Sequence, residues 1–295
     1  MPLFSKGGIF KFNMKKVAIQ GYAGCFHHIA AQAYAGGEVD ILPCDTFRDV
    51  ARAVERREVD YGLMAIENSI AGSILPNYNI LQSCNLHIVG EISQQICQNL
   101  LVNRGVQLED IREVESHQMA LLQCSEFLDK YNWRLIESAD TALSAKKLQI
   151  TGSRHVAAVA STLAAELFDL DVIAADIHTI KNNYTRFLVL EYCDRKEFAP
   201  EYSVLNGNKA SLYFKVPDRS GSLYHTLGAF EDLSINMTKL QSYPIPTEPW
   251  HYMFHTDMEF DNVDNFRRLI ERMREMGTEV HVYGVYKANI NREKH

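Results

Sequence analysis

The stretch NNYTRF, residues 182–187, places two amides, a hydroxyl and a guanidinium directly before an apolar run. Phe187 to Leu190 have the composition of a buried strand, so the polar residues before them need an explanation. One hypothesis is a loop that satisfies the hydrogen bonds of its own turn. The other is a binding cleft, and the rest of the chain has to decide between the two.

Polar side chains recur at the ends of other predicted strands. They are Glu67, Asn68 and Ser69 after one strand, Ser116, His117 and Gln118 after a second, and Ser161 and Thr162 after a third. Ligands collect at the carboxyl ends of strands in open α/β sheets, where helix N-termini also point. Each of these side chains alone is better explained as a helix N-cap. Together with Thr185 and Arg186, they predict a cleft for a small polar anion.

Other chemistries have little support. The segment GYAGCF lacks the GxGxxG spacing, and no GxxxxGK[ST] motif occurs in the chain. His27 and His28 are neighbours that point in different directions on a helix, whereas His251 and His255 lie far apart along an extended strand. No carboxylate or thiol completes either pair. We therefore predict no metal and no cofactor.

The elements that must position these residues follow from the spacing of apolar residues. Short strands alternate with helices of about ten residues, beginning with strand 15–21, helix 26–37, strand 38–44, helix 46–59 and strand 60–69. This alternation predicts an α/β fold with a largely parallel sheet. Residues 91–102 break the pattern, which indicates a crossing between two lobes.

Composition changes after residue 193. Residues 194–208 carry charges, Pro200 and Gly207 without periodicity and are predicted to form a linker. Strands and helices then follow in the order βαββαβ, which predicts a ferredoxin-like unit. The predicted division is an N-terminal extension (1–13), an α/β domain (14–193), the linker (194–208), the C-terminal unit (209–288) and a tail (289–295).

Length and composition limit the class of protein. The chain has 295 residues, 46% of them hydrophobic and 23% charged, as in ordinary globular proteins of one or two domains. A net charge of -7 without a basic stripe argues against a nucleic-acid partner. No apolar run reaches the roughly eighteen residues of a membrane span. The six scattered cysteines predict reduced thiols and a cytoplasmic protein, with Cys25 a small buried thiol.

Five segments spread over residues 15–287 occur in an order shared with a known family. They are GYAGCFHHIAA, MAIENSIAGS, ESHQMALLQC, NNYTRFLVL and SGSLYHTLGAFEDLSINMTKLQSYP. The chain thereby resembles prephenate dehydratases that carry a C-terminal ACT regulatory domain. The most specific match combines the triplet Thr-Arg-Phe at 185–187 with Glu-Asn-Ser at 67–69. The resemblance implies a catalytic domain of two α/β lobes, similar to type II periplasmic binding proteins, with the cleft between them.

The resemblance also implies a reaction and roles for residues. Prephenate loses CO2 and water to give phenylpyruvate, and the gain of an aromatic ring makes a cofactor or metal unnecessary. Thr185 is then the hydrogen-bond donor to the leaving hydroxyl, and Glu67 orients its neighbours or supplies a proton if burial raises its pKa. Arg186 either clamps a carboxylate or braces the loop. The remaining substrate-positioning residues are expected to be Asn68, Ser69, Ser116 and Ser161.

Some positions depart from the family pattern. Cys25 and His27 replace hydroxyl residues, and Gln118 and Met119 replace a proline and a glutamine. In the C-terminal unit, Gln241 and Tyr243 replace an acidic and a basic residue, which leaves open whether L-phenylalanine is the effector. The effector-site frame is still represented by Gly221, Leu223, Asn236 and Met237. ACT domains bind ligands between paired copies, so the resemblance implies a homodimer or homotetramer.

Three hypotheses therefore compete. The first is prephenate dehydratase in L-phenylalanine biosynthesis. The second is arogenate dehydratase, whose substrate has an amino group where prephenate has a keto group; a free carboxylate placed to meet the ammonium would favour it. The third is a non-catalytic amino-acid sensor, which would have little reason to keep Thr185.

Overall fold

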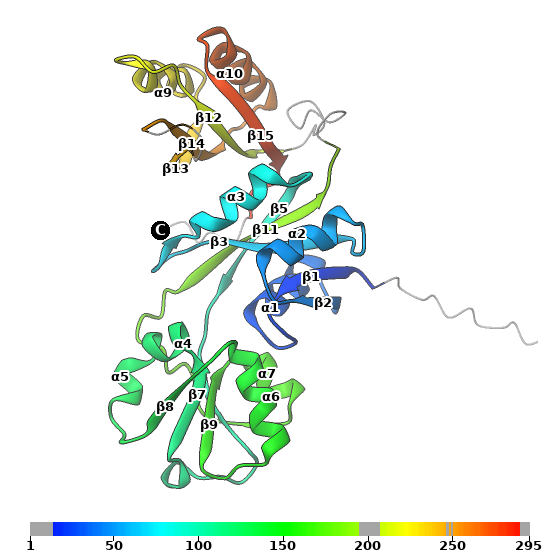
Figure 1. The fold of residues 1–295 in the computed structure, drawn as a ribbon, viewed down its shortest axis with the longest axis vertical. Coiled ribbons are helices and arrows are strands. Elements are labelled where there is room, and N and C mark those ends of the chain that lie inside the picture. The colour runs from blue at the N-terminus through cyan, green and yellow to red at the C-terminus, as the bar shows by residue number, and fades with distance from the viewer. Residues whose placement is uncertain (1–13, 195–206, 246–247, 249, 290–295) are drawn as a thin grey trace, which may run out of the picture.

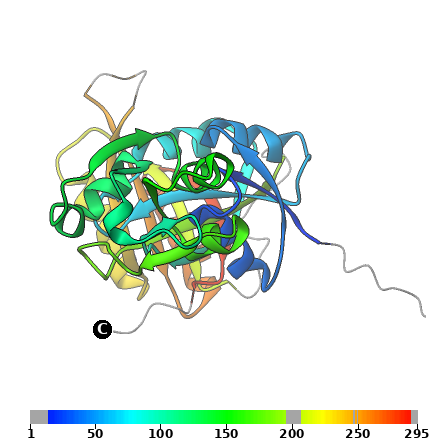
Figure 2. The same ribbon diagram turned by 90° about the horizontal axis from the view of Figure 1, so that it is seen from below.

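The computed structural model describes residues 14–194, 207–245, 248 and 250–289. Within these ranges the chain forms three sheets. They lie one after another along the long axis, with the first lobe in the middle, the second lobe at one end and the C-terminal unit at the other (Figure 1). A view along this axis shows the second lobe in front of the other two (Figure 2).

The first lobe has a mixed sheet with strand order β2-β1-β3-β11-β5, and β4 pairs with β3. Its elements are β1 (Lys16–Gln20), α1 (Phe26–Ala35), β2 (Asp40–Cys44), α2 (Phe47–Glu55), β3 (Tyr61–Asn68), β4 (Gly72–Ser73), α3 (Leu75–Ser83), β5 (Leu86–Gln95) and β11 (Tyr184–Tyr192). Pro43 is tolerated in β2 because this strand lies at the edge of the sheet. Val17, Ile19, Leu63 and Phe187 belong to the buried core.

The second lobe has the strand order β10-β6-β9-β7-β8. Its elements are β6 (Asn99–Val102), a 3-10 helix η1 (Leu108–Asp110), β7 (Glu113–His117), α4 (Gln118–Gln123), α5 (Ser125–Leu128), β8 (Arg134–Ser138), α6 (Thr141–Thr151), β9 (Val156–Ala160), α7 (Thr162–Leu167) and β10 (Asp171–Ala174). Asp140 and Ser161 cap α6 and α7 by accepting hydrogen bonds from backbone N–H groups of the first turns.

The chain passes between the two lobes twice, at residues 96–98 and at 175–183. The two crossing segments are hydrogen-bonded, from Ile96 N to Asn183 O at 2.8 Å and from Ile177 N to Gln98 O at 2.8 Å. The predicted crossing is thus confirmed. The expected largely parallel sheet is only partly correct, because β11 and β6 run antiparallel to their neighbours. Each of these strands enters its lobe from a crossing segment.

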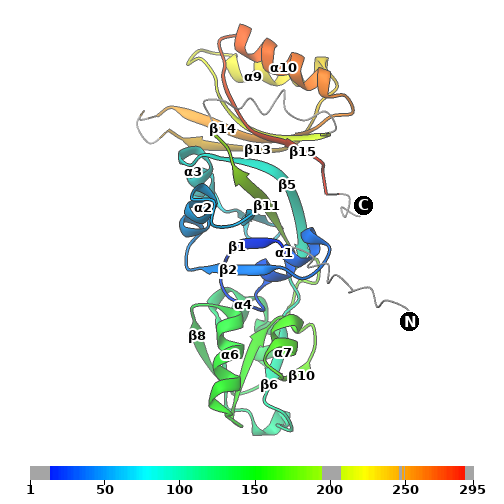
Figure 3. The same ribbon diagram turned by 90° about the vertical axis from the view of Figure 1, so that its right-hand side faces the viewer.

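The C-terminal unit has the predicted βαββαβ order. Its elements are β12 (Lys209–Lys215), α9 (Ser222–Asp232), β13 (Asn236–Pro244), β14 (Tyr252–Glu259), α10 (Val263–Glu275) and β15 (Glu279–Tyr286), with strand order β13-β14-β12-β15. Helices α9 and α10 cover one face of this sheet, and the opposite face lies on β5 and α3 of the first lobe (Figure 3). Tyr283 and Tyr286 therefore join the apolar core around Ile88 and Leu190.

Candidate functional site

The start of β11 lies against the end of β3 and carries the candidate catalytic hydroxyl. Thr185 pairs with Asn68 across the two strands, beside the pair Arg186 and Glu67. Asn68 Nδ2 donates a hydrogen bond of 3.0 Å to Thr185 Oγ1 and one of 2.7 Å to Asn183 Oδ1. The structure therefore brings Thr185 and Asn68, two of the predicted site residues, into direct contact.

The other contacts of Asn68 define how its amide is oriented. Its Oδ1 accepts hydrogen bonds from the backbone N–H groups of Ile70 (3.0 Å) and Ala71 (2.9 Å). The amide oxygen thus serves the turn after β3, and the nitrogen points toward β11. Because Asn68 donates to Thr185, the threonine oxygen is the acceptor in this contact. The Thr185 proton can then be donated to another group.

Asn183 was not among the predicted site residues, although it belongs to the same polar segment. Its side chain is 0% exposed, and its Nδ2 has no hydrogen-bond partner among the described residues. An unpaired buried amide nitrogen is costly, so it is a candidate contact for a ligand. Asn183 lines a pocket of about 330 Å³ between the lobes. The other lining residues are Ile70, Met119, Leu122, Gln123, Ser125, Glu126, His178, Thr179 and Ile180.

Ser69 holds the segment before β11 in place. Its hydroxyl donates to Asn182 O at 3.1 Å and accepts from Tyr184 N at 2.9 Å. Its backbone N–H donates to Tyr184 O at 2.8 Å. The loop therefore satisfies much of its own turn, as one of the two hypotheses about this segment required. Ser69 itself supports the loop that presents Asn183 to the pocket.

Ser116 and Ser161 do not fit their predicted role as substrate contacts. Both are 0% exposed. Ser116 Oγ donates to Val159 O at 2.6 Å. Ser161 Oγ donates to Gly24 O at 2.5 Å and accepts from Ala164 N at 3.0 Å. The Ser116 hydroxyl joins two strands. The Ser161 hydroxyl caps α7, which is the N-cap alternative that local sequence could not exclude.

Arg186 points away from the pocket and into the interface with the C-terminal unit. Its Nε contacts Glu67 Oε1 at 2.6 Å, its Nη1 contacts Glu91 Oε2 at 3.0 Å, and its Nη2 pairs with Asp257. Arg186 as a whole is only 5% exposed. A guanidinium whose three nitrogens are all engaged by carboxylates is not placed to clamp a substrate. This geometry corresponds to the bracing alternative.

Glu67 is not placed to act as a proton source either. Its carboxylate contacts Arg186 and Lys239. Burial alone would raise the pKa of Glu67, but the Arg186 and Lys239 cations outweigh burial and lower the pKa below its usual value. The condition for the proton-source alternative, a pKa raised by burial, is therefore not met. Glu67 remains ionised and belongs to the interface.

In the first turn, Cys25 and His27 stand where the family has hydroxyl residues; Cys25 is buried and His27 is half-buried. Burial raises the pKa of Cys25 to about 12, so its thiol is a poor nucleophile. Burial lowers the pKa of His27 to about 3, and its ring packs against Phe187 with centroids 4.7 Å apart. Gly24, with φ +92°, lets this turn approach Ala164 of the second lobe. These residues serve lobe packing.

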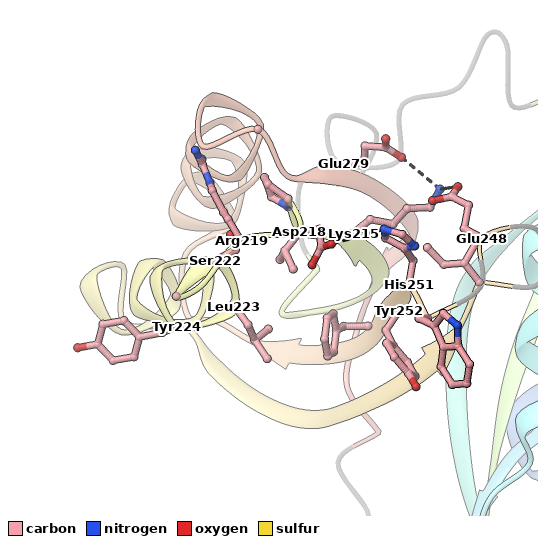
Figure 4. A pocket seen from close by; sticks show the side chains of 17 residues that line it. Lys215, Asp218, Arg219, Ser222, Leu223, Tyr224, Glu248, His251, Tyr252 and Glu279 are labelled. Atoms are coloured by element: carbon pink, nitrogen blue, oxygen red, sulfur yellow. Dashed lines mark ion pairs between the residues drawn. The ribbon is translucent and has the colours of Figure 1, made fainter.

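A second pocket, of about 600 Å³, lies in the C-terminal unit. Gly221 and Leu223 line it, as Figure 4 shows for Leu223. Lys215 approaches Glu279 at 3.4 Å and Glu248 at 3.9 Å on its rim. Two further predicted effector residues are not among its lining residues. Asn236 is the first residue of β13, and Met237 packs against the apolar core of the C-terminal unit.

One group of side chains in the described part of the chain has the spacing of metal ligands. Cys97, Asp176 and His178 place their ligand atoms within 4.8 Å of one another at the crossing segments. Burial raises the pKa of the Cys97 thiol and lowers that of His178. A metal bound through Cys97 would have to displace the thiol proton. The absence of a metal stays a prediction.

Comparisons with known proteins agree with the resemblance. A family-wide sequence model described as prephenate dehydratase matches residues 17–195. Over 284 residues the chain is 37% identical to arogenate dehydratase/prephenate dehydratase 2 of Arabidopsis thaliana, covering 92% of this chain and 72% of that protein. A solved structure described as a quorum quenching acylase has a TM-score of 0.83 at 28% identity, with 95% and 100% of the two chains covered. A prephenate dehydratase from Arthrobacter aurescens in complex with L-Phe has a TM-score of 0.77 at 23% identity, with 94% of this chain and 91% of that chain covered.

In the described ranges, no helix combines the length and the apolar character that crossing a membrane requires.

Proposed function

This chain belongs to the prephenate dehydratase family, and we propose that it converts prephenate to phenylpyruvate in L-phenylalanine biosynthesis. The reaction breaks a C–C bond to release CO2. The electron pair of that bond completes the aromatic ring while the ring hydroxyl departs and is protonated to water. The protein must orient a dianion and support the departing hydroxyl.

The contact between Asn68 and Thr185 is the observation that carries this proposal. Asn68 donates a hydrogen bond to the Thr185 oxygen. The hydroxyl proton of Thr185 therefore points away from β3. A threonine hydroxyl is too weak an acid to release its proton fully, so Thr185 stabilises the leaving oxygen by hydrogen bonding. General-acid assistance of this kind contributes about 10² to 10⁴ in rate.

We propose that Asn183 binds the substrate. Its buried Nδ2 can donate to a substrate oxygen that takes the place of its missing partner. The apolar side chains of Ile70, Met119 and Leu122 in the same pocket offer a surface for the ring. A ligand held there would contact both lobes, since Ile70 belongs to the first and Leu122 to the second.

Arogenate is a second candidate substrate, because a carboxylate lies in this pocket. Glu126, at the start of α5, lines the pocket with Asn183 and is exposed. A carboxylate there can pair with the ammonium group by which arogenate differs from prephenate. Glu126→Gln would lower kcat/KM for arogenate and leave that for prephenate unchanged if Glu126 has this role.

Acyl transfer, suggested by the described activity of one structural neighbour, has less support. A hydroxyl nucleophile needs a base within hydrogen-bonding distance. Among the described residues, the side-chain hydrogen-bond partner of Thr185 is the amide nitrogen of Asn68, which cannot accept a proton. We therefore favour the dehydratase reaction.

The deciding experiment measures phenylpyruvate formation from prephenate by the wild type, Thr185→Ala and Thr185→Ser. We expect turnover in the wild type, a loss of about 10² to 10⁴ in kcat for Thr185→Ala, and much smaller losses for Thr185→Ser, which keeps the hydroxyl. No turnover of prephenate or arogenate by folded wild type would contradict the dehydratase proposal and leave the sensor hypothesis.

We further propose that residues 209–288 form an ACT regulatory domain, and that L-phenylalanine binds its pocket at Gly221 and Leu223. The support is the pocket of about 600 Å³ and the L-Phe complex described for a structural relative. The proposed assembly is a homodimer or homotetramer in the cytoplasm. Titration calorimetry with L-phenylalanine should show binding that Leu223→Asp abolishes, with L-alanine as the control ligand, and light scattering should give the oligomer size.

A further inference from the structure

The sheet of the C-terminal unit presents a polar face to the first lobe. Side chains alternate between the two faces of a strand, so Lys209 and Ser211 of β12, Lys239 of β13 and His255 and Asp257 of β14 share this face. We call these five residues the docking face. Lys209 is 0% exposed, and Asp257 is 6% exposed. Charges are buried on this scale only when partners compensate them.

The partners come from the first lobe. Arg186 pairs with Asp257, Lys239 pairs with Glu67, and Lys209 Nζ lies 2.8 Å from Glu91 Oε1. Ser211 Oγ donates to Asp257 Oδ1 at 2.5 Å, so that carboxylate is held from two sides. Within this cluster the first lobe supplies one cation and two anions, and the docking face supplies two cations and one anion. The two sides are complementary in charge.

The docking face meets the two strands that hold the candidate catalytic hydroxyl. On β3 and β11 the cross-strand pair Arg186 and Glu67 is adjacent to the pair Thr185 and Asn68. Neighbouring side chains point to opposite faces, so the first pair reaches the docking face and the second does not. The strand register shifts immediately after Arg186. Irregularities of this kind are frequent next to active sites, where they change the direction of a side chain.

Resting on the proposed dehydratase activity, we infer that Asp257 and Lys239 of the C-terminal unit are positioning residues for Thr185. Asp257 and Lys239 fix the positions of Arg186 and Glu67 through ion pairs. Because Thr185 and Asn68 are the chain neighbours of these two residues, their positions are fixed as well. The catalytic site is therefore completed by the C-terminal unit. A change in how that unit sits on the first lobe alters the placement of the Thr185 hydroxyl.

Close backbone contact makes this docking geometry sensitive to small changes. A Cβ atom at Gly284 of β15 would collide with the carbonyl oxygen of Ile88 on β5. Only glycine permits this approach, and neither residue belongs to the ion cluster. Gly284→Ala therefore displaces the docking face without removing a charge.

The test uses the full chain and compares Asp257→Asn, Lys239→Gln and Gly284→Ala with Asp232→Asn. Asp232 makes an exposed ion pair with Arg272 in the same unit, so it is a matched control. We expect the first three variants to lower kcat by about tenfold to a hundredfold, because small misplacements of catalytic groups have effects of that size. KM of these three variants should change far less than kcat. Lys239→Arg should keep the kcat that Lys239→Gln loses, and Asp232→Asn should match the wild type.

Hydrogen exchange provides a readout that does not need turnover. Peptides covering residues 182–190 should exchange faster in Asp257→Asn, Lys239→Gln and Gly284→Ala than in the wild type or Asp232→Asn. An inactive wild type would refute the proposed function, while exchange would still test the coupling. Unchanged kcat and unchanged exchange in Lys239→Gln and Gly284→Ala would overturn the inference; circular dichroism identifies any variant that fails to fold.

Discussion

Thr185 and Arg186 are consecutive residues of one strand, yet their side chains serve opposite sides of the sheet. Thr185 accepts a hydrogen bond from Asn68, whereas Arg186 is surrounded by Glu67, Glu91 and Asp257. The alternation of side chains in β11 produces this division. One short segment thereby carries the candidate chemistry and the anchor for the C-terminal unit.

Replacing Asn68 by aspartate should reduce activity without unfolding the site. The introduced carboxylate would still accept from the backbone of Ile70 and Ala71, but it cannot donate to Thr185. It would accept the Thr185 proton and withdraw it from the substrate. We expect kcat to fall by about 10² to 10⁴, the range for loss of acid assistance. The free energy of unfolding should fall by about 1–3 kcal/mol, because Asn183 Oδ1 loses the donor that now contacts it.

Steady-state kinetics and urea denaturation of Asn68→Asp measure both quantities. Asn132→Asp, at an exposed loop position, is the control for the added charge. Wild-type kcat in Asn68→Asp would show that this contact does not orient the hydroxyl.

Arg186→Met should destabilise the protein strongly. Three carboxylates would lose a buried cation, and breaking a buried ion cluster costs about 3–5 kcal/mol. Arg186→Lys should recover little of this loss, because one ammonium cannot reproduce the planar fork that contacts three groups. Urea denaturation measures the effect. The control Arg272→Met removes an exposed pair and should cost less than about 1 kcal/mol; equal losses in both variants would contradict this account.

Acid should destabilise the protein through His255. Burial lowers the pKa of this side chain from 6.5 to about 4, so the unfolded chain binds its proton more readily than the folded protein does. The stability contributed by the neutral ring is complete above about pH 6.5 and is lost as the pH falls toward 4. The difference is about 3 kcal/mol.

Unfolding free energies measured between pH 4 and 7 test this dependence. His255→Gln, which cannot titrate, should show a flatter profile than the wild type over this range. Parallel profiles would mean that other groups dominate; His27, with its pKa lowered to about 3, is the first candidate.

Gly24→Ala should destabilise the contact between the lobes. Gly24 has φ +92°, and a Cβ there would lie 2.9 Å from Ala164 Cα. Backbone strain and overpacking together should cost about 2–4 kcal/mol. Gly36 has φ +72° with nothing within 4 Å of its Cβ position, so Gly36→Ala should show only the strain of about 1–2 kcal/mol. Thermal unfolding of both variants checks the difference, and equal shifts would exclude overpacking at Gly24.

The amino-acid sequence by itself determined the local structure of this protein. Apolar periodicity placed strands and helices, and the break at 91–102 located the lobe crossing, because these patterns depend on neighbouring residues. The segment before β11 and the triplet after β3 also marked the residues that the fold joins, Thr185 and Asn68.

Only the tertiary structure decided which polar side chains are available. Ser116 and Ser161 are enclosed by strands and helices distant in sequence. The Oδ1 of Asn183 accepts from Asn68, whereas its Nδ2 has no partner among the described residues. The antiparallel direction of β11 followed from the second crossing. Arg186 met Asp257 across an interface that no local pattern encodes, because pairing between distant residues depends on how whole sheets pack.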